Sequence, residues 1–545
     1  MRNRIFQTYT KLQTNNLNFI VHFENNKRVV KSFKEFYNDV ENYINKLNYL
    51  KNKRSLENIV LIGPTSYYWM VLDHACIKGG YKSIAIPETY SAKNIQDIYN
   101  NTYIDLTICD FTQKDIISLL NIDNLYYFNC KDNINNSFES IESAVLNDNK
   151  NENLIRDDYT IVFSSGTSEK VKKINWSFTK NEDKKSLKDR INLLFSIINY
   201  KLSFWSRRDN KVIIFMPFSH PVNRSIAMSA LMQNVNIVIS DPKNCYKHII
   251  TEKPNIMFAV PPVYEAISQN IKIRLEKFSG IRKVIFYLFN SLGINGLGNS
   301  NPIKRIFSVL LFKKIKKLYG GKADYFVTGS APINTDVLKI FYSVGVKVYE
   351  AYGQTESTTI MNDRRNFRIG SVGRPKKGAV KISQEGELLL KYNAEYHEQN
   401  KEILNIKDNW IYTGDLAYMD NDGFIFILGR KDDVIILENG KKINPFSIEN
   451  KIKTNSNIDH AIVFSQDKLK VKAIINYSNK LEIKDVYQWI SKVNNGLSTY
   501  EKINSVYLTS EPFSIENGLL TSTLKIKRKS ILEKYSKEKF EPISV

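Results

Sequence analysis

A hydroxyl-rich turn after an apolar run is the first segment whose residue types could do chemistry. Residues 159–163 predict a buried strand. The turn and the start of the next segment contain Ser164, Ser165, Gly166, Thr167, Ser168, Lys170 and Lys172. Backbone N–H groups, hydroxyls and ammonium groups bind polyphosphates, because they donate hydrogen bonds and neutralise charge. The spacing is not that of a GxxxxGK[ST] loop, and turns of this composition also occur in loops that bind nothing.

Two acidic residues farther along the chain could complete such a site. Glu356 ends the segment 346–356, a strand pattern that runs into a glycine turn. A carboxylate near a phosphate loop can hold Mg²⁺. Asp415 stands in the tight turn 412–415, where its carboxylate could accept two hydrogen bonds from a ribose diol. A turn aspartate also commonly caps the local backbone, so neither acid is strong evidence alone.

Parallel sheets are the elements that must position these residues. Between 55 and 360, short β-branched or aromatic runs alternate with longer amphipathic stretches, which is typical of βαβ layers. Buried strands are expected at 58–62, 83–86, 106–109, 159–163, 212–215 and 255–259. From about 366, closely spaced glycines indicate a smaller, mostly β section. The end of the chain mixes strand and helix patterns, so the sequence predicts an α/β protein followed by a small α+β domain.

Length and composition exclude several classes of protein. The chain has 545 residues, of which 42% are hydrophobic and 25% charged, which predicts a soluble globular protein of two or more domains. Apolar stretches such as 284–289 and 306–312 are far shorter than the roughly 20 residues of a membrane span. No secretory signal or zinc-ligand spacing is evident, and the four cysteines are scattered. We therefore expect a cytoplasmic protein.

The net charge of +22 is concentrated in one segment. Residues 272–322 contain twelve basic residues and one acid, together with the apolar clusters 284–289 and 306–312. Such a mixture is typical of an amphipathic element at an anionic membrane surface, which predicts peripheral membrane contact. A solvated insertion packed on the core explains the segment equally simply, and a coding bias toward lysine could explain the overall excess. A nucleic-acid partner is not favoured, because no nucleic-acid-binding module is recognisable.

In chain order, several motifs resemble those of the adenylate-forming superfamily, which includes acyl-CoA synthetases, luciferases and peptide-synthetase adenylation domains. Residues 164–168 resemble its SSGTTG phosphate loop, 329–332 its GGAP turn, 352–356 its YGxTE motif and 412–415 its TGD motif. Residues 429–433 are similar to the GRxDD hinge, and 516–528 to the ENGLLTPTLKLKR element of long-chain fatty acid ligases. The resemblance covers nearly the whole chain. It implies an N-terminal adenylation domain, 1–429, and a mobile C-terminal domain, 430–545.

The resemblance implies roles for the matching residues. Lys525, Glu356 and Thr167 would be catalytic: Lys525 bridges the substrate carboxylate and the α-phosphate, Glu356 ligates Mg²⁺, and Thr167 holds phosphate with Lys172. Tyr352 would stack on adenine, and Asp415 and Arg430 would bind the ribose. The implied nucleotide site also includes Ser164, Ser165, Gly166, Ser168, Ser330, Ala331, Pro332, Glu350, Ala351, Gly353 and Thr355. His220 and Gly329 would line the acyl pocket, and Asp432 would be the hinge.

The chemistry agrees with these roles. Attack of a carboxylate on an α-phosphate brings two anions together, so a mobile cation and Mg²⁺ must neutralise the charge that develops. Without the motif, Lys525 would be interpreted as surface charge beside Lys527, Arg528 and Lys529, and His220 as a structural histidine.

The sequence departs from the family pattern at four positions. Glu169, Val171 and Lys173 stand where the family usually has Gly, Pro and Gly, and Ser522 replaces a proline before the catalytic lysine. Glu169 places an anion and a Cβ where phosphate approaches closely, which predicts weaker ATP binding or a differently bent loop.

The predicted function is ATP- and Mg²⁺-dependent activation of a carboxylic acid, most simply a fatty acid, to acyl-AMP and transfer to the thiol of CoA. The first alternative is transfer to the phosphopantetheine of an acyl carrier protein. The second is a nonenzymatic binding protein derived from this fold with an altered phosphate loop.

Overall fold

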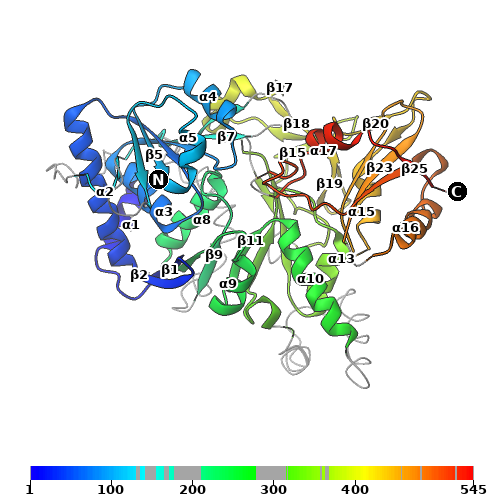
Figure 1. Ribbon diagram of the computed structural model, residues 1–545, viewed down its shortest axis with the longest axis horizontal. Coiled ribbons are helices and arrows are strands. Elements are labelled where there is room, and N and C mark those ends of the chain that lie inside the picture. The colour runs from blue at the N-terminus through cyan, green and yellow to red at the C-terminus, as the bar shows by residue number, and fades with distance from the viewer. Residues whose placement is uncertain are drawn as a thin grey trace.

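The computed structural model of the chain describes most of the sequence. The described residues are 2–129, 136–141, 155–164, 171–176, 210–277, 315, 317–355, 359–361, 367–455, 457–478, 481–521 and 524–543. Within them, a large N-terminal α/β domain is followed by a small α+β domain at the C-terminus, as the sequence predicted (Figure 1). The exact boundary, expected after Gly429, stays a prediction.

Two large sheets form the body of the N-terminal domain. The first sheet has the order β14-β13-β12-β11-β9-β10-β1-β2 and the second β6-β5-β3-β4-β7-β8. Strands of the first sheet are β1 (Phe19–Glu24), β2 (Lys27–Ser32), β9 (Lys211–Ile214), β10 (Asn236–Ile239), β11 (Ile256–Ala259), β12 (Tyr325–Thr328), β13 (Val348–Gly353) and β14 (Thr359–Met361). Strands of the second are β3 (Asn58–Ile62), β4 (Lys82–Ile86), β5 (Leu106–Asp110), β6 (Leu125–Phe128), β7 (Thr160–Ser164) and β8 (Lys172–Trp176).

The pairing is parallel inside both sheets and antiparallel only at the edge strands β2, β14 and β8. The six expected strands correspond to β3, β4, β5, β7, β9 and β11, and no strand end differs from the expected end by more than one residue, so the prediction of buried parallel strands is confirmed.

Alternate side chains of each strand enter different cores. In β3, Ile59 and Leu61 join the large cluster that lies between the two sheets, whereas Val60 and Ile62 face the outer helices of the second sheet. A strand buried on both faces needs apolar residues at consecutive positions, which explains the unbroken β-branched runs in the sequence.

Helices cover the faces of the sheets, and α2, α3 and α8 contribute to the core between them. Local signals fix their ends: Ser32 and Glu35 form a capping box at the start of α2, and Gly80 ends α3 in the left-handed conformation. The N-terminal domain contains α1 (Arg2–Leu12), α2 (Phe33–Lys53), α3 (Tyr67–Gly79), α4 (Ala92–Asn100), α5 (Lys114–Ile117), α8 (Pro221–Met232), α9 (Cys245–Glu252), α10 (Pro261–Glu276), α13 (Thr335–Ser343) and α14 (Ala394–His397), with 3₁₀ turns η1 (Phe111–Gln113), η3 (Lys317–Tyr319) and η4 (Glu398–Ile403).

A third sheet follows the two large ones, as the closely spaced glycines indicated. It has the order β15-β16-β18-β17, with β19 paired to β18. Its strands are β15 (Val380–Ile382), β16 (Glu387–Lys391), β17 (Ile406–Lys407), β18 (Trp410–Met419) and β19 (Ile425–Arg430). The antiparallel pair β18 and β19 brings Asp415 opposite Arg430.

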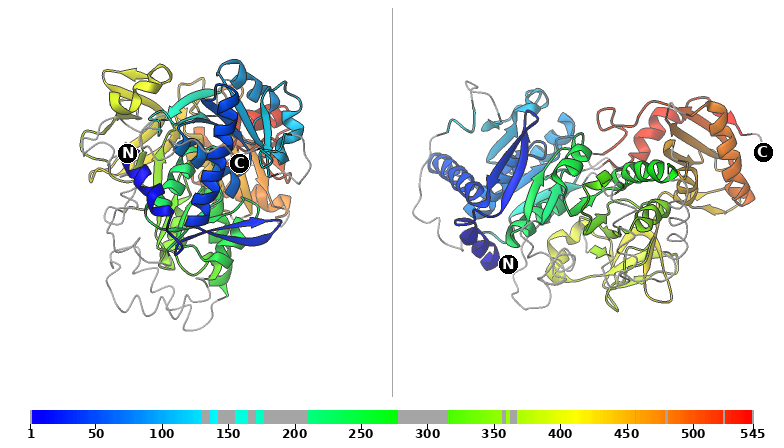
Figure 2. Two further views of the ribbon diagram at one scale, coloured as in Figure 1. Left: turned by 90° about the vertical axis from the view of Figure 1, so that its left-hand side faces the viewer. Right: turned by 90° about the horizontal axis from the view of Figure 1, so that it is seen from below.

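The C-terminal domain lies beside the large domain, at the right in Figure 1 and orange to red in Figure 2. A four-stranded sheet carries helices and loops on both faces, with Val463 in one core and Ile462 in the other. The elements after 430 are β20 (Ile435–Ile436), β21 (Lys442–Ile443), α15 (Pro445–Ile452), β22 (Ile458–Phe464), β23 (Val471–Tyr477), α16 (Ile483–Asn495), η5 (Thr499–Glu501), β24 (Ile503–Thr509), α17 (Arg528–Tyr535) and β25 (Glu541–Pro542).

Among the described residues, no helix is both long and apolar enough to cross a membrane. Most of the basic segment 272–322 lies outside the described residues, so its predicted contact with an anionic membrane stays a prediction.

Candidate functional site

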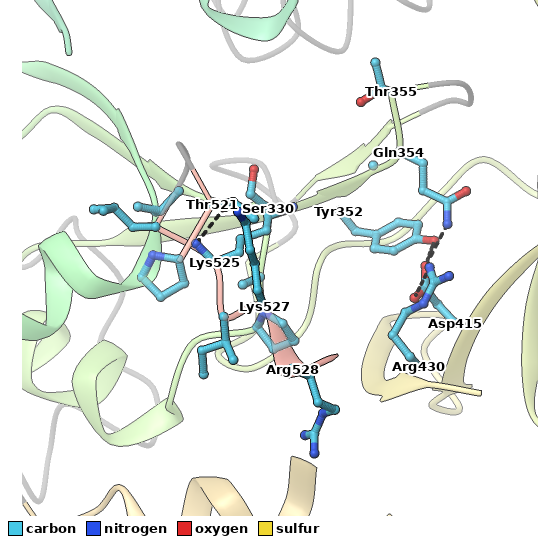
Figure 3. A pocket seen from close by; sticks show the side chains of 18 of the residues that line it. Ser330, Tyr352, Gln354, Thr355, Asp415, Arg430, Thr521, Lys525, Lys527 and Arg528 are labelled. Carbon is cyan, nitrogen blue, oxygen red and sulfur yellow. Dashed lines mark hydrogen bonds and ion pairs between the residues drawn. The ribbon is translucent and has the colours of Figure 1, made fainter. Parts of the chain in front are cut away.

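A cavity of about 2320 Å³ is lined by residues of both domains. Its wall includes the turn Gly329–Pro332 after β12, the end of β13, His220 at the start of α8, and Lys525 from the C-terminal domain. Figure 3 shows Lys525 with Thr521 and Ser330 in one part of the cavity and Tyr352 with Asp415 and Arg430 in another. Residues that are far apart in the sequence therefore line one cavity, and they include residues predicted to bind the nucleotide and residues predicted to bind the acid.

Asp415 is the acceptor for three side-chain donors. The Tyr352 hydroxyl donates to Oδ2 at 2.6 Å, Gln354 Nε2 donates to the same oxygen at 3.0 Å, and an Arg430 guanidinium nitrogen donates to Oδ1 at 3.2 Å. Burial and the charge of Asp415 raise the pKa of Tyr352 well above its usual value, so its hydroxyl remains a donor. The carboxylate is thus fixed in orientation at the cavity wall.

The sequence predicted a tight turn at 412–415, but these residues lie within β18, whose irregular part at Gly414 is held by a second carboxylate. Gly414 has a φ of 74°, and a Cβ there would lie 3.3 Å from an Arg430 guanidinium nitrogen, so glycine suits both the backbone and the packing. The buried Glu387 accepts from the Gly414 N–H at 2.9 Å and from Lys431 Nζ at 3.1 Å. One buried side chain therefore links the part of β18 before Asp415 to the segment that contains the expected hinge, Asp432, which also lines the cavity.

Lys525 is held in a tight loop. Its backbone N–H donates to the Thr521 hydroxyl at 3.0 Å, and the Thr521 N–H donates to the Lys525 carbonyl at 2.8 Å. Leu524 has a φ of 57° and packs against cores of both domains. The loop conformation, and not α17 that follows it, directs Lys525 to the cavity.

His220 begins α8 and lies near Lys525. Its Nδ1 accepts the Val222 N–H at 3.4 Å. Burial, and then the charge of Lys525, lower the pKa of His220 to about 4, so the ring is neutral near pH 7. With Nδ1 as acceptor, Nε2 carries the hydrogen and can donate.

Glu350 is a buried carboxyl group on β13 that lines the cavity. Its Oε1 accepts the Gly370 N–H at 2.8 Å. Burial raises the pKa of Glu350 to about 8, although the Gly370 bond opposes this. The group is therefore largely protonated near pH 7 and adds little negative charge.

Several predicted site residues lie outside the described residues: Ser165, Gly166, Thr167, Ser168 and Glu356, together with Glu169. The ends of the phosphate loop are described, because Ser164 of β7 pairs with Lys172 of β8. Lys172 lines the cavity, as do Gly329, Ser330, Ala331, Pro332, Ala351, Gly353 and Thr355. The roles assigned to these residues stay predictions.

The sequence prediction missed Gln354, Glu387 and Trp176. Gln354 stands inside the 352–356 motif, so its position could have suggested a role. Trp176 Nε1 donates to the Thr355 carbonyl at 3.1 Å and ties β8 to the end of β13. No local pattern marks Trp176 or Glu387, because their partners are far away in the sequence.

Comparisons with known proteins agree with this arrangement. The sequence matches the family described as AMP-binding enzyme over residues 13–391 and the AMP-binding enzyme C-terminal domain over 432–539. Long-chain-fatty-acid–CoA ligase FadD15 of Mycobacterium bovis is 23% identical over 88% of this chain and 87% of the relative. Long-chain-fatty-acid–CoA ligase 5 of Rattus norvegicus is 25% identical over 84% of this chain and 76% of the relative.

Solved structures share the fold at low identity. The adenylation domain of a carboxylate reductase from Mycobacterium chelonae has a TM-score of 0.71 and 16% identity, covering 98% of this chain and 89% of that one. O-succinylbenzoate coenzyme A synthetase from Bacillus subtilis, determined with ATP and magnesium, has a TM-score of 0.66 and 16% identity, covering 96% and 98%.

Proposed function

Because the chain belongs to the AMP-binding enzyme family, we propose that it joins a fatty acid to the thiol of CoA. Members of this family are adenylate-forming, acyl-activating enzymes, so the proposal concerns the acid and the acceptor. In the first step the acid carboxylate attacks the α-phosphate of ATP, which gives acyl-AMP and pyrophosphate. In the second, the thiol attacks the acyl carbon, loses its proton and releases AMP.

The observation that carries the proposal is that Lys525 lines the same cavity as His220 and Asp415. A carboxylate and an α-phosphate approach each other only when their charges are neutralised, and Lys525 can supply a cation from the C-terminal domain. Near it, the neutral His220 can donate from Nε2 to a carboxylate without adding a second positive charge. Asp415, fixed by three donors, is suited to a ribose diol.

The fatty acid is supported by the apolar part of the cavity. One side of α8 faces the cavity through Val222, Met228 and Met232, and Phe258 and Val327 of the first sheet line it as well. The twelve residues of α8 span roughly 16 Å at 1.5 Å per residue, which suits a chain of many methylene groups. The two ligases compared above act on long-chain fatty acids by name, which supports the same class of substrate here.

The nucleotide and the CoA are supported by positive charge. Basic side chains of the C-terminal domain line the cavity at Lys468, Lys525, Lys527, Arg528, Lys529 and Lys537, and polyphosphates are bound by such groups. Mg²⁺ would neutralise the phosphates further. Its expected ligand, Glu356, lies outside the described residues, so the metal site stays part of the proposal.

The test is ATP–pyrophosphate exchange across a set of carboxylic acids, followed by acyl-CoA formation with CoA. We expect exchange with long-chain fatty acids and a loss of about a hundredfold to a thousandfold in Lys525→Met, since one group that stabilises transition-state charge is removed. Lys484→Met, on α16 and exposed, is the matched control and should retain activity. Absence of exchange with every acid would contradict the proposal and favour a nonenzymatic binding protein.

A carrier-protein thiol is the second candidate acceptor. It is favoured by the likeness to a carboxylic acid reductase of Segniliparus rugosus, whose structure contains an adenylation domain with a carrier domain, at a TM-score of 0.73 and 16% identity over 98% of this chain and 81% of that one. Separate incubation of the acyl-AMP with CoA and with a phosphopantetheinylated carrier protein distinguishes the two acceptors.

A further inference from the structure

An ion pair joins the two domains at the edge of the cavity. Lys453 Nζ of the C-terminal domain lies 3.4 Å from Glu265 Oε1 of α10 in the large domain. Both side chains are only about a fifth exposed, at 21% and 23%, and both residues line the cavity. In Figure 1 and in the right-hand view of Figure 2, α10 reaches toward the C-terminal domain.

A second carboxylate interacts electrostatically with the same lysine. Asp459 is an exposed residue of β22 in the C-terminal domain; partial desolvation, followed by the negative charge of Glu265, raises its pKa, whereas Lys453 lowers it. Two carboxylates of different domains therefore repel each other, and Lys453 neutralises both. His460, the next residue, is held neutral by burial and by Lys453, which lower its pKa to about 4, so it supplies no compensating charge.

The charges of Lys453, Glu265 and Asp459 affect the orientation of the domain that carries Lys525. Apart from the contacts of the hinge segment, the described residues contain one other ion pair between the two domains. It joins Lys243 and Glu516 at 3.6 Å, and its side chains are 85% and 69% exposed. Exposed pairs contribute little, because water and salt screen them. The mostly buried Lys453–Glu265 pair is the stronger restraint on how the C-terminal domain, and with it Lys525, is oriented over the cavity.

We propose that Lys453 is a positioning residue that holds the C-terminal domain in the orientation in which Lys525 lines the cavity, by pairing with Glu265 and offsetting the negative charge of Asp459. This inference rests on the proposed function for its kinetic consequences, but the domain orientation is measurable without activity. Loss of Lys453 removes an attraction and exposes a repulsion. Loss of the Glu265 charge removes both the attraction and the repulsion, so Glu265→Gln should have a smaller effect than Lys453→Met.

The kinetic test compares Lys453→Met, Glu265→Gln and the double variant in the two half-reactions. ATP–pyrophosphate exchange should fall about fivefold or more in Lys453→Met, and less in Glu265→Gln, because a partly buried pair shifts a two-state equilibrium by about that factor. The double variant should recover to the level of Glu265→Gln alone. Transfer of a preformed acyl-AMP to CoA should change less than twofold in all three.

The structural test is the distance between spin labels at Leu119→Cys and Leu469→Cys, two exposed positions in different domains, in a Cys130→Ser background. The described native cysteines are buried. Lys453→Met should broaden the distance distribution, and the addition of Glu265→Gln should narrow it to the distribution of Glu265→Gln alone. If the wild-type protein shows no exchange, the proposed function fails while the distances still test the orientation.

Three results would overturn the inference: additive losses in the double variant, an equal fall of both half-reactions, or an unchanged distance distribution in Lys453→Met. Lys243→Met is the matched control at the exposed pair and should leave both readouts within twofold of the wild type. An effect equal to that of Lys453→Met would show that any charge between the domains serves, and would also overturn the assignment.

Discussion

Substitution of Asp415 by asparagine removes one charge from the centre of the site while it keeps the shape of the side chain. The carboxylate accepts from Tyr352 and Gln354 on Oδ2 and from Arg430 on Oδ1. An amide offers one oxygen, so the orientation that preserves the two bonds at Oδ2 turns the amide N–H groups toward the guanidinium. The Arg430 bond is then lost.

The size of the effect follows from these contacts. Hydrogen bonds to charged groups contribute about 1.5–3 kcal/mol each, compared with about 1 for neutral pairs. Arg430 is 41% exposed and can turn to water, so the low end of this range applies. The proposed bonds from the ribose hydroxyls would likewise lose their charged acceptor, so we expect AMP to bind Asp415→Asn with an affinity lowered by about 1.5 kcal/mol, roughly twelvefold in Kd.

Isothermal titration calorimetry of AMP binding measures this change. Asp420→Asn is the matched control: Asp420 follows the same strand, accepts from Arg368 and from the Phe424 N–H, and is not among the residues of the cavity. A Kd for Asp415→Asn within threefold of the wild type, or an equal loss in both variants, would refute the reasoning. Circular dichroism of each variant checks that the fold is retained.

Three further predictions concern buried groups. Burial raises the folded-state pKa of Glu350 to about 8. The neutral carboxyl group therefore contributes stability that is fully present below the unfolded pKa and is lost as pH rises through about 8. Glu350→Gln should raise the melting temperature more at pH 9 than at pH 5. Gly414→Ala should lower stability by about 1–2 kcal/mol, because a left-handed residue gains a Cβ close to Arg430; denaturant unfolding measures it, and a neutral effect would contradict the strain. Arg224 donates to both oxygens of Asp73 in a buried pair. Arg224→Met should therefore lower the free energy of unfolding by about 3–5 kcal/mol, and Arg224→Met/Asp73→Leu should lower it clearly less. Equal losses in thermal unfolding would show that packing, and not the unpaired buried charge, dominates.

The strands of the core were predictable because their signal is local. In β3 and β9, consecutive apolar residues face different cores. Burial on both faces therefore produces an apolar run within four or five adjacent positions, which the sequence shows directly. The site motifs were predictable for the same reason, since the residues of each turn are adjacent and their order along the chain matches the family.

The contacts that orient the site were not predictable. Tyr352 and Gln354 meet Asp415 across about 60 residues, and Glu265 meets Lys453 across 188. Such pairs depend on the register of distant strands and on how two domains sit together, and neither leaves a local pattern. The edge strand β2 was missed because its residues are largely charged and none is buried. The strand β1 has an apolar run, but it precedes residue 55, where the alternating pattern begins.

The place of β1 has a consequence for how the protein is made. β1 pairs with β2 directly after it, but Ile20 and Val21 also pair in parallel with Ile237 and Val238, so this hairpin must wait for its other neighbour, which is encoded about 200 residues later. At the usual 5–20 residues per second, this interval lasts on the order of 10–40 s. Ile20 and Val21 of β1 are fully buried in the native state, and they stay uncovered on the β10 side while the second sheet is synthesised. Nascent chains shorter than about 240 residues should therefore depend on chaperones, whereas the second sheet, whose strands are close in sequence, can fold while translation continues.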